Sequence, residues 1–515
     1  MKKTFILMAA MLSAFSLSAA ELNIYASGLK AGATADDNTV EIQYVLNTPA
    51  TALEMQFLND AGDVRATIAI TDAALLTKGP HTTTVSLAGV PQGNWAWAMK
   101  ATGASNPAPD GEEDDPILEQ INAANDTTYI FYSPRGVVVD NSFESDHLGW
   151  MYVTEAWDGD TDGASAWSKA QKRGLFIYNQ LLVYPYEQNQ KNIGFLGGVG
   201  FSDSKHGMRS PAVDEDGYVF VCDKNVDAGT TGVWMADPAN PTNNFVEVLD
   251  VTQRGTVFTQ AVSAAVEGSG ANRVLYVLDY MDGIVRYPIG TAATPYALPG
   301  DTVINSLATY NLVNTDCTMK QDGKGGFWLF QNRGQLDGYP MVVHYTAAGE
   351  VDFQIVSGMN AELAPASAYR GAGAVSVDGK YMAFAGNKTV NLYEVKFKGN
   401  GEIKSVARVL DYEFPNIGTN IDGIAFDVAN NIFVVSASAE YLYVFSLPKD
   451  DNTFVTPAAA RYAIESKSDF GDSVDNINAV KAVKGVYDIT GRYLGESAEG
   501  LPKGVYIING EKTVK

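Results

Sequence analysis

The chain has 515 residues, enough for several domains that each bury a core of their own. It carries 60 Asp and Glu against 36 Lys and Arg, a formal net charge of −24, which argues against binding to nucleic acid or to an anionic membrane surface. Its 49 Gly, 26 Tyr and 22 Phe favour an all-β protein, because aromatic side chains suit strands and glycines suit tight turns.

The first 20 residues have the pattern of a secretory signal peptide. Lys2 and Lys3 precede an apolar run over residues 5–17, and the small residue Ala20 suits cleavage directly after it. The run is too short to span a bilayer, and no later stretch reaches the length of a transmembrane helix. The sequence therefore predicts an exported protein without a membrane span.

Residues 21–103 alternate between apolar and polar side chains, which predicts a small β-sandwich. The alternation is clearest over Val40–Tyr44 and Leu53–Phe57, and Trp95 and Trp97 either fill the core or hold a sugar. The Val-Glu-Ile-Gln-Tyr strand, the Ala-Gly-Asp turn and the Val-Pro-Gln-Gly-Asn-Trp-Ala-Trp segment resemble the immunoglobulin-like domain of flagellar hook-capping proteins and many secreted Bacteroidetes proteins. This resemblance implies a spacer or adhesion module.

Two polar stretches are predicted to be linkers. Residues 104–126 are acidic and contain Pro and Gly, and residues 451–479 are also polar. They separate residues 127–450 from the modules at either end of the chain.

Residues 127–450 contain six blocks that repeat one order of short strands. The blocks start at Arg135–Asp140, Arg209–Asp214, Val262–Val266, Cys317–Lys320, Gly373–Asp378 and Asp422–Asp427. They recur about 50 to 75 residues apart, as four-stranded propeller blades with loop insertions do. We therefore predict a six-bladed β-propeller. Its sixth block shows three strands, and Thr128–Tyr132 is expected to supply the fourth and close the ring.

The segment Asp422-Gly-Ile-Ala-Phe-Asp-Val-Ala-Asn-Asn-Ile-Phe-Val resembles an NHL repeat. Propellers of this type include scaffolds, glycan binders, lactonases and lyases, so the resemblance implies a fold and leaves the function open.

Residues 480–515 form a short β module. The order Val-Tyr-Asp-Ile-Thr-Gly-Arg, then Leu-Pro-Lys-Gly-Val-Tyr-Ile, then a basic end resembles the C-terminal sorting domain of the type IX secretion system. This resemblance implies a secreted or cell-surface protein of Bacteroidetes with the secretion machinery as a partner. If the module no longer sorts, the periplasm is the expected location.

One end of the predicted ring collects charged and aromatic side chains. The candidate ligand-binding residues there are Arg135, Arg209, Arg370, Asp422, Tyr280 and Arg333. Three arginines at equivalent strand ends could clamp a carboxylate or sulfate, or could pair with neighbouring aspartates and join the blades.

A calcium site is a further hypothesis. Asp158, Asp160 and Asp162 alternate with Gly and Thr and match the first half of a calcium loop. Lys169 stands where a complete loop would have Glu, so an exposed turn is the other interpretation.

Catalytic motifs are few. No zinc-like His spacing, nucleophile elbow or phosphate loop occurs, and His206, Arg209 and Tyr280 form the one candidate catalytic set. Cys222 and Cys317 are either bridged or two buried thiols.

The sequence thus predicts an all-β protein, a six-bladed propeller between a sandwich and a short β module. It favours a secreted or surface protein that binds a glycan or a surface or host protein at the channel mouth. The alternative is a propeller enzyme, a polysaccharide lyase, hydrolase or lactonase-like enzyme.

Overall fold

The computed structural model describes most of the chain. The described residues are 21–33, 38–108, 118, 120–123, 126–157, 172–186, 193–201, 207–223, 229–242, 244–251, 261–279, 282–305, 317–331, 340–356, 362–364, 371–386, 388–409, 414–415, 417–418, 420–464, 486–488, 493–495, 497, 499, 505–508 and 511–514. The chain forms two compact units, residues 1–463 and 464–515. The fold is all-β, as predicted, and the signal-peptide pattern lies outside the described residues.

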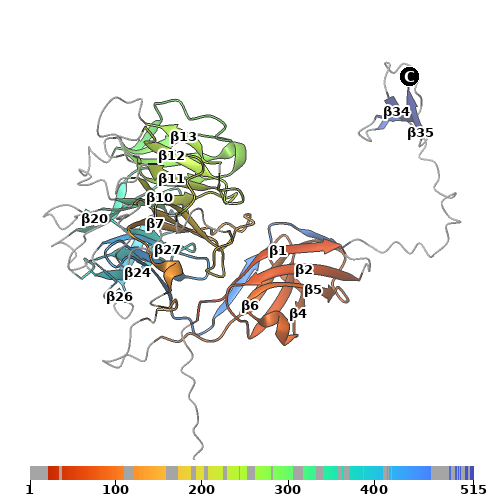
Figure 1. Ribbon diagram of the computed structural model, residues 1–515. Helices are drawn as coiled ribbons and strands as arrows, with labels where there is room; N and C mark the ends of the chain where they lie inside the picture. Colours follow the sequence, from red (N-terminus) through yellow and green to blue (C-terminus); the bar gives the residue numbers. More distant parts are fainter. Residues whose placement is uncertain are drawn as a thin grey trace, which may run out of the picture. The chain divides into compact units, whose positions relative to one another are not determined.

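The N-terminal part of the first unit is a sandwich of two antiparallel sheets (Figure 1). One sheet contains β1 (Ala26–Ala33), β2 (Thr39–Leu46) and β5 (Gly79–Ser86), and the other contains β3 (Ala52–Leu58), β4 (Val64–Ala69) and β6 (Gly93–Thr102). β2 buries every second side chain, as the predicted alternation requires. Trp97 is buried in this domain, whereas Trp95 is half-buried and donates its indole N–H to the Pro91 carbonyl.

Two strands of the predicted second linker complete this sandwich, so the prediction of a linker from residue 451 is wrong at its start. β30 (Thr453–Pro457) and β31 (Tyr462–Ile464) both pair with β6, and Figure 1 shows the blue strands within the red and orange domain. The polar sequence of β30 hid it, because Thr456 is the fully buried residue there and binds the Ala26 carbonyl through its hydroxyl.

Six antiparallel sheets follow in the described part of residues 127–450. The first three contain β7 (Pro134–Val139), β8 (Met151–Glu155) and β9 (Gly174–Tyr178); β10 (Met208–Val213), β11 (Val219–Asp223), β12 (Gly232–Ala236) and β13 (Val246–Asp250); and β14 (Ala261–Glu267), β15 (Val274–Asp279), β16 (Gly283–Tyr287) and β17 (Asp301–Ile304). The next three contain β18 (Thr318–Gln321), β19 (Phe327–Phe330), β20 (Pro340–Tyr345) and β21 (Val351–Val356); β22 (Gly373–Val375), β23 (Tyr381–Ala385), β24 (Thr389–Phe397), β25 (Ile403–Arg408) and β26 (Phe414–Pro415); and β27 (Ile421–Phe426), β28 (Asn431–Ser436) and β29 (Tyr441–Ser446).

These sheets form a β-propeller. The innermost strands β7, β10, β14, β18, β22 and β27 contact one another in order, and β27 also contacts β7, so the ring is closed. A separate apolar cluster fills the space between each sheet and the next, including that between the last and the first. Burial of apolar side chains on both faces of every sheet is therefore what holds the ring together.

Residues before β7 run along the outer edge of the last sheet. Ile121 donates its N–H to the Val444 carbonyl, Phe131 donates to the Glu440 carbonyl, and Ile130 forms a β-bridge with Tyr441. Residues 128–132 thus lie beside the last sheet, as predicted, but they form one β-bridge there instead of a fourth strand. The reason is local, because Asp126 accepts the Thr128 N–H and starts a short 3₁₀ turn there.

A network of buried amides joins the sandwich to the propeller. The side-chain carbonyl of Asn431 accepts the Asn23 N–H at 2.7 Å, and its side-chain N–H donates to the Asn23 carbonyl and to Asp427. The Asn23 side chain donates in turn to the Leu447 carbonyl. Because the Asn431 side chain both accepts from and donates to the Asn23 backbone, this network fixes one orientation of the two domains.

The second unit contains one four-stranded antiparallel sheet. Its strands are β32 (Val486–Asp488), β33 (Tyr493–Gly495), β34 (Val505–Ile508) and β35 (Glu511–Val514), in the order β33-β32-β34-β35. This agrees with the short β module predicted for residues 480–515. Within the described part of the chain, no helix is long and apolar enough to cross a membrane.

The joint between the two domains should respond to pH through Asp427. Burial raises the pKa of Asp427 to about 7, although the N–H groups of Asn431 and Ala429 lower it. The stabilisation of the folded state by protonated Asp427 is therefore complete below the unfolded pKa of about 3.9 and is lost as the pH rises through 7. Urea unfolding measures this effect. Between pH 4 and pH 8, the free energy of unfolding of Asp427→Asn should rise by about 2 to 4 kcal/mol relative to that of the wild type.

The control for this experiment is Asp60→Asn, which changes an exposed carboxylate of the sandwich. A difference between wild type and Asp427→Asn that does not change with pH would contradict the raised pKa.

Candidate functional site

The innermost strands carry β-bulges at matching places near their N-terminal ends. The ladder register shifts at Arg135 in β7, at Val262 in β14 and at Asp422 in β27, and a longer shift follows Arg209 in β10. A bulge takes the extra residue out of the ladder and redirects its side chain. The backbone therefore directs Arg135 and Asp422 at the same end of the ring, which we call the bulge end.

Arg135 and Asp422 form an ion pair across the point where the ring closes. The Arg135 Nη1 atom lies 3.1 Å from Asp422 Oδ1, and the two side chains are 6% and 5% exposed. The pair joins β7 of the first sheet to β27 of the last. For Arg135, the structure thus supports the interpretation that an arginine joins neighbouring blades, because its guanidinium is already paired.

Glu155, the last residue of β8, lies beside this pair. Its two carboxylate oxygens accept the N–H groups of Ser133 and Trp157 at 2.6 and 2.9 Å. Burial raises the pKa of Glu155 to about 8; these two N–H groups and Arg135 lower it, while Asp422 raises it. Glu155 therefore holds two backbone segments in place at the bulge end, one at Ser133 just before β7 and one at Trp157 just after β8.

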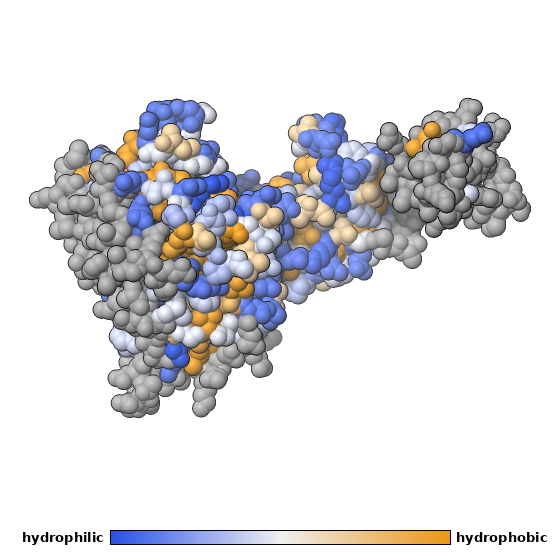
Figure 2. Space-filling model, turned by 90° about the horizontal axis from the view of Figure 1, so that it is seen from above, coloured by the Kyte–Doolittle hydropathy of each residue, from blue (hydrophilic) through white to orange (hydrophobic). Residues whose placement is uncertain are grey.

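The two segments that Glu155 holds carry an aromatic pair. Tyr132 and Trp157 meet edge to face with their ring centroids 5.5 Å apart, and Trp157 is 38% exposed. Scattered exposed hydrophobic residues are usual on a protein surface, and Figure 2 shows several such patches between hydrophilic residues. Trp157 differs because it is the one aromatic residue among the large, clearly exposed hydrophobic residues that the structure describes. Trp157 is not among the site residues predicted from the sequence.

The corresponding strand ends of the next sheets also carry buried polar residues. Asp223 at the end of β11 accepts the Thr230 hydroxyl, and Asp279 at the end of β15 accepts the Asp282 N–H. Gln331 after β19 donates to the Pro340 carbonyl. Each of these side chains makes a hydrogen bond to a residue that follows the second strand of its sheet. They therefore fix the start of the connecting segment at the bulge end.

Few of the predicted site residues can be placed. Arg209 is buried at the bulge end, next to the register shift of β10. The other candidates lie outside the described residues: His206, Tyr280, Arg333, Arg370, Asp158, Asp160 and Asp162. The structure thus brings Arg135 and Asp422 together, and the arginine clamp, the catalytic set and the calcium loop stay predictions.

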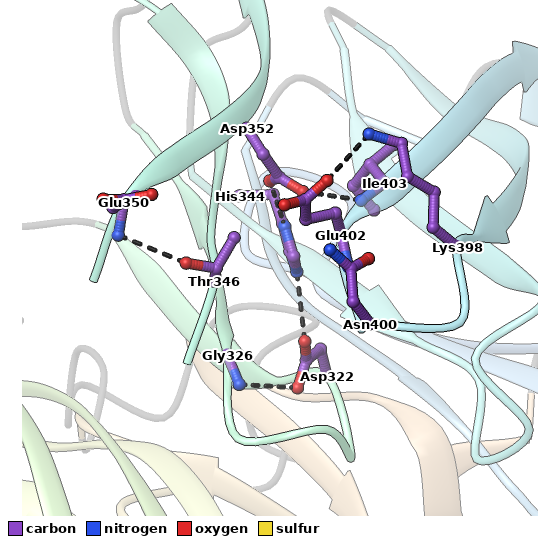
Figure 3. Close-up of polar contacts among 10 residues, drawn as sticks. All are labelled: Asp322, Gly326, His344, Thr346, Glu350, Asp352, Lys398, Asn400, Glu402 and Ile403. Carbon is purple, nitrogen blue, oxygen red and sulfur yellow. Dashed lines mark hydrogen bonds and ion pairs between the residues drawn. The ribbon is translucent and has the colours of Figure 1, made fainter. Parts of the chain in front are cut away.

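His344 on β20 lies between two carboxylates in the fourth sheet (Figure 3). Its Nδ1 is 2.6 Å from Asp352 and its Nε2 is 3.2 Å from Asp322, and both nitrogens can donate only in the imidazolium form. Asp352 also accepts the Ile403 N–H from the next sheet. Because His344 is fully buried, we assign this chain of contacts a structural role between two blades.

Metal-binding clusters and cysteines offer no further site in the described part of the chain. No group of three or more His, Cys, Asp or Glu is placed to hold a metal ion there. Cys222 and Cys317 are both buried free thiols, so of the two alternatives the bridge is not formed. Burial and the charge of Asp223 raise the pKa of Cys222 to about 12, which makes that thiol unreactive.

Comparison with known proteins finds no matching family model and no matching curated protein. Solved structures do match. A calcium structure of a Trichoderma reesei carbohydrate-active enzyme of family AA12 is 13% identical, over 67% of this chain and 98% of that one, with a TM-score of 0.37. The PQQ domain of pyranose dehydrogenase from Coprinopsis cinerea is 11% identical, over 67% and 100%, with a TM-score of 0.36.

The WD40 propeller domain of Doa1 is 11% identical over 62% of this chain and 97% of that chain, with a TM-score of 0.30. At such values none of these likenesses bears on activity. The assignment of a propeller rests on the closed ring of sheets in this chain.

The Asp322–His344–Asp352 contacts predict a large loss of stability for His344→Leu. Burial acts to raise the pKa of Asp322, but hydrogen bonds from His344 and two backbone N–H groups hold it below its usual range. The stabilisation by ionised Asp322 is present above the unfolded pKa of about 3.9 and is lost as the pH falls through the lower folded pKa. In urea unfolding at pH 7, His344→Leu should lower the free energy of unfolding by about 3 to 5 kcal/mol.

His81→Ala is the matched control, because His81 is a half-buried histidine of the sandwich. A cost of His344→Leu no larger than that of the control, or one that grows below pH 4, would refute the charged contacts.

Proposed function

We propose that this protein is a secreted or cell-surface binding protein that holds a glycan at the bulge end of its propeller. The observation that carries the proposal is the exposed Trp157 ring, ordered against Tyr132 beside the Arg135–Asp422 pair. The exported location rests on the sequence patterns of residues 1–20 and 480–515.

A sugar needs two kinds of surface, and both are close together here. The C–H face of a sugar ring packs against a flat aromatic ring, while its hydroxyl groups need fixed hydrogen-bond partners at the edge. Trp157 offers the ring, and the chain around Glu155 offers polar groups held by buried contacts. Because Glu155 already fixes the Trp157 backbone, little conformational entropy is lost on binding.

A glycan suits this surface better than a partner protein does. A protein interface usually needs a broad patch with an apolar centre, whereas Trp157 presents one aromatic ring. The predicted calcium loop, Asp158 to Asp162, follows Trp157 directly in the sequence. The proposal therefore includes calcium as a cofactor.

A propeller enzyme that acts on carbohydrate is the second proposal, and Glu155 is the observation that favours it. With its pKa raised to about 8 by burial, Glu155 keeps its proton at neutral pH, as a general acid must. However, Glu155 is fully buried and both its oxygens accept backbone N–H groups. An enzyme would therefore depend on Arg209 together with His206 and Tyr280.

The test is a glycan array followed by titration of the best glycan, with and without calcium. Trp157→Ala should weaken binding about tenfold or more, because an exposed aromatic contact contributes on the order of 1 to 2 kcal/mol. Trp95→Ala is the matched control, since Trp95 is the half-buried tryptophan of the sandwich.

Equal binding by wild type and Trp157→Ala, or loss of binding in Trp95→Ala alone, would contradict the proposed site. Cleavage of the bound glycan, lost in His206→Ala, would support the enzyme instead.

A further inference from the structure

The channel through the ring is nearly closed at a waist formed by its innermost strands. Small residues from six strands surround it: Gly136, Ser210, Ser263, Thr318, Gly373 and Gly423. A Cβ atom at Gly136 would lie 2.5 Å from Pro211, so the blades approach as closely as glycine allows. The waist has a volume of about 10 Å³, room for about one water. The described part of the ring therefore has two separate ends.

A larger cavity opens at the end of the ring opposite the bulge end. It has a volume of about 480 Å³ and lies at the C-terminal ends of the innermost strands, and we call it the vestibule. Its apolar walls include Val138, Val213, Val266, Val375 and Val377. Val377 is 49% exposed, so this apolar wall is open to a ligand. The volume falls within the range of about 300 to 1,000 Å³ usual for small-molecule sites.

Lys320 on β18 lines both the waist and the vestibule. No carboxylate of the described residues forms an ion pair with it, although two carboxylates line the vestibule and Asp422, which is paired with Arg135, lines the waist. Asp214 is paired with Arg273 at 2.5 Å, and Glu215 is exposed. The ammonium group of Lys320 therefore has no ion-pair partner among the described residues, in a cavity lined by valines and by polar residues such as Asn141 and Gln321.

Such a charge has an energetic cost that an anion would offset. Desolvation disfavours a cation in apolar surroundings, and here burial lowers the pKa of Lys320 to about 8. At neutral pH most of the lysine still carries its proton. A bound carboxylate would restore the missing partner and would gain a charge-assisted hydrogen bond.

We propose that the vestibule binds a small organic carboxylate, whose charged group pairs with Lys320 and whose apolar body packs against the valines. The unpaired ammonium selects the charge of the ligand, and the valine walls select its apolar part. This site is independent of the proposed glycan site, because the waist separates the two ends of the ring. Loss of one activity would therefore leave the other intact.

Octanoate is a suitable probe, with octan-1-ol as its uncharged analogue. Calorimetric titration of the full chain should show octanoate binding, with octan-1-ol at least about tenfold weaker. Lys320→Met keeps the length of the side chain and removes its charge, so it should weaken octanoate binding about tenfold or more. Lys324→Met is the matched control, because Lys324 is an exposed lysine of the same hairpin and does not line the vestibule.

Lys320→Met is expected to fold, since it removes an unpaired charge. Val377→Asp is a second variant, at an exposed position of the vestibule wall. Its carboxylate should form an ion pair with the Lys320 ammonium group and so weaken octanoate binding as well. Absence of octanoate binding by the wild type, equal binding by Lys320→Met, or octan-1-ol binding as tight as octanoate would each overturn the proposal.

Discussion

The ring of sheets has to close, and the rest of the structure depends on that constraint. Each sheet buries apolar side chains on both faces, so a ring left open would expose two such faces to water. The last contact, between β27 and β7, joins residues almost 300 positions apart along the chain. This junction is stabilised in three ways: by apolar packing, by the Arg135–Asp422 ion pair, and by the edge contacts of residues 121–131.

The closure also determines where chemistry can take place. Blades that approach to the limit set by Gly136 and Gly423 leave almost no space at the waist, so a ligand must approach one end or the other. The two ends have different characters. Bulges and strand ends give one end its charged and aromatic groups. The other end is a cavity lined by valines and polar residues, in which Lys320 has no ion-pair partner among the described residues. One propeller can thus offer two unrelated binding surfaces.

The repeats in the sequence predicted the sheets, their order and the approximate place of residues 128–132. Recurring short apolar runs carried that information, because side chains on both faces of a blade are buried. An apolar run does not encode a bulge, so the pairing of Arg135 with a neighbouring aspartate could be proposed only as one of two interpretations. Trp157 and Lys320 were missed because the local sequence does not show that the Trp157 ring is exposed or that Lys320 faces a cavity. The strand β30 was missed because its inward residue is Thr456, a polar side chain satisfied by a hydrogen bond.

The pairing of β30 with β6 makes the propeller an insertion within the sandwich. One sandwich sheet lacks an edge strand until residues 453–457 have been synthesised, after all of the propeller. The sandwich therefore cannot be completed until the propeller has been synthesised, and the chain on both sides of the propeller belongs to the sandwich. A chain cut short before residue 453 would leave β6 with an open edge, prone to pairing with another chain. Almost the whole chain must therefore be synthesised before its first domain is complete.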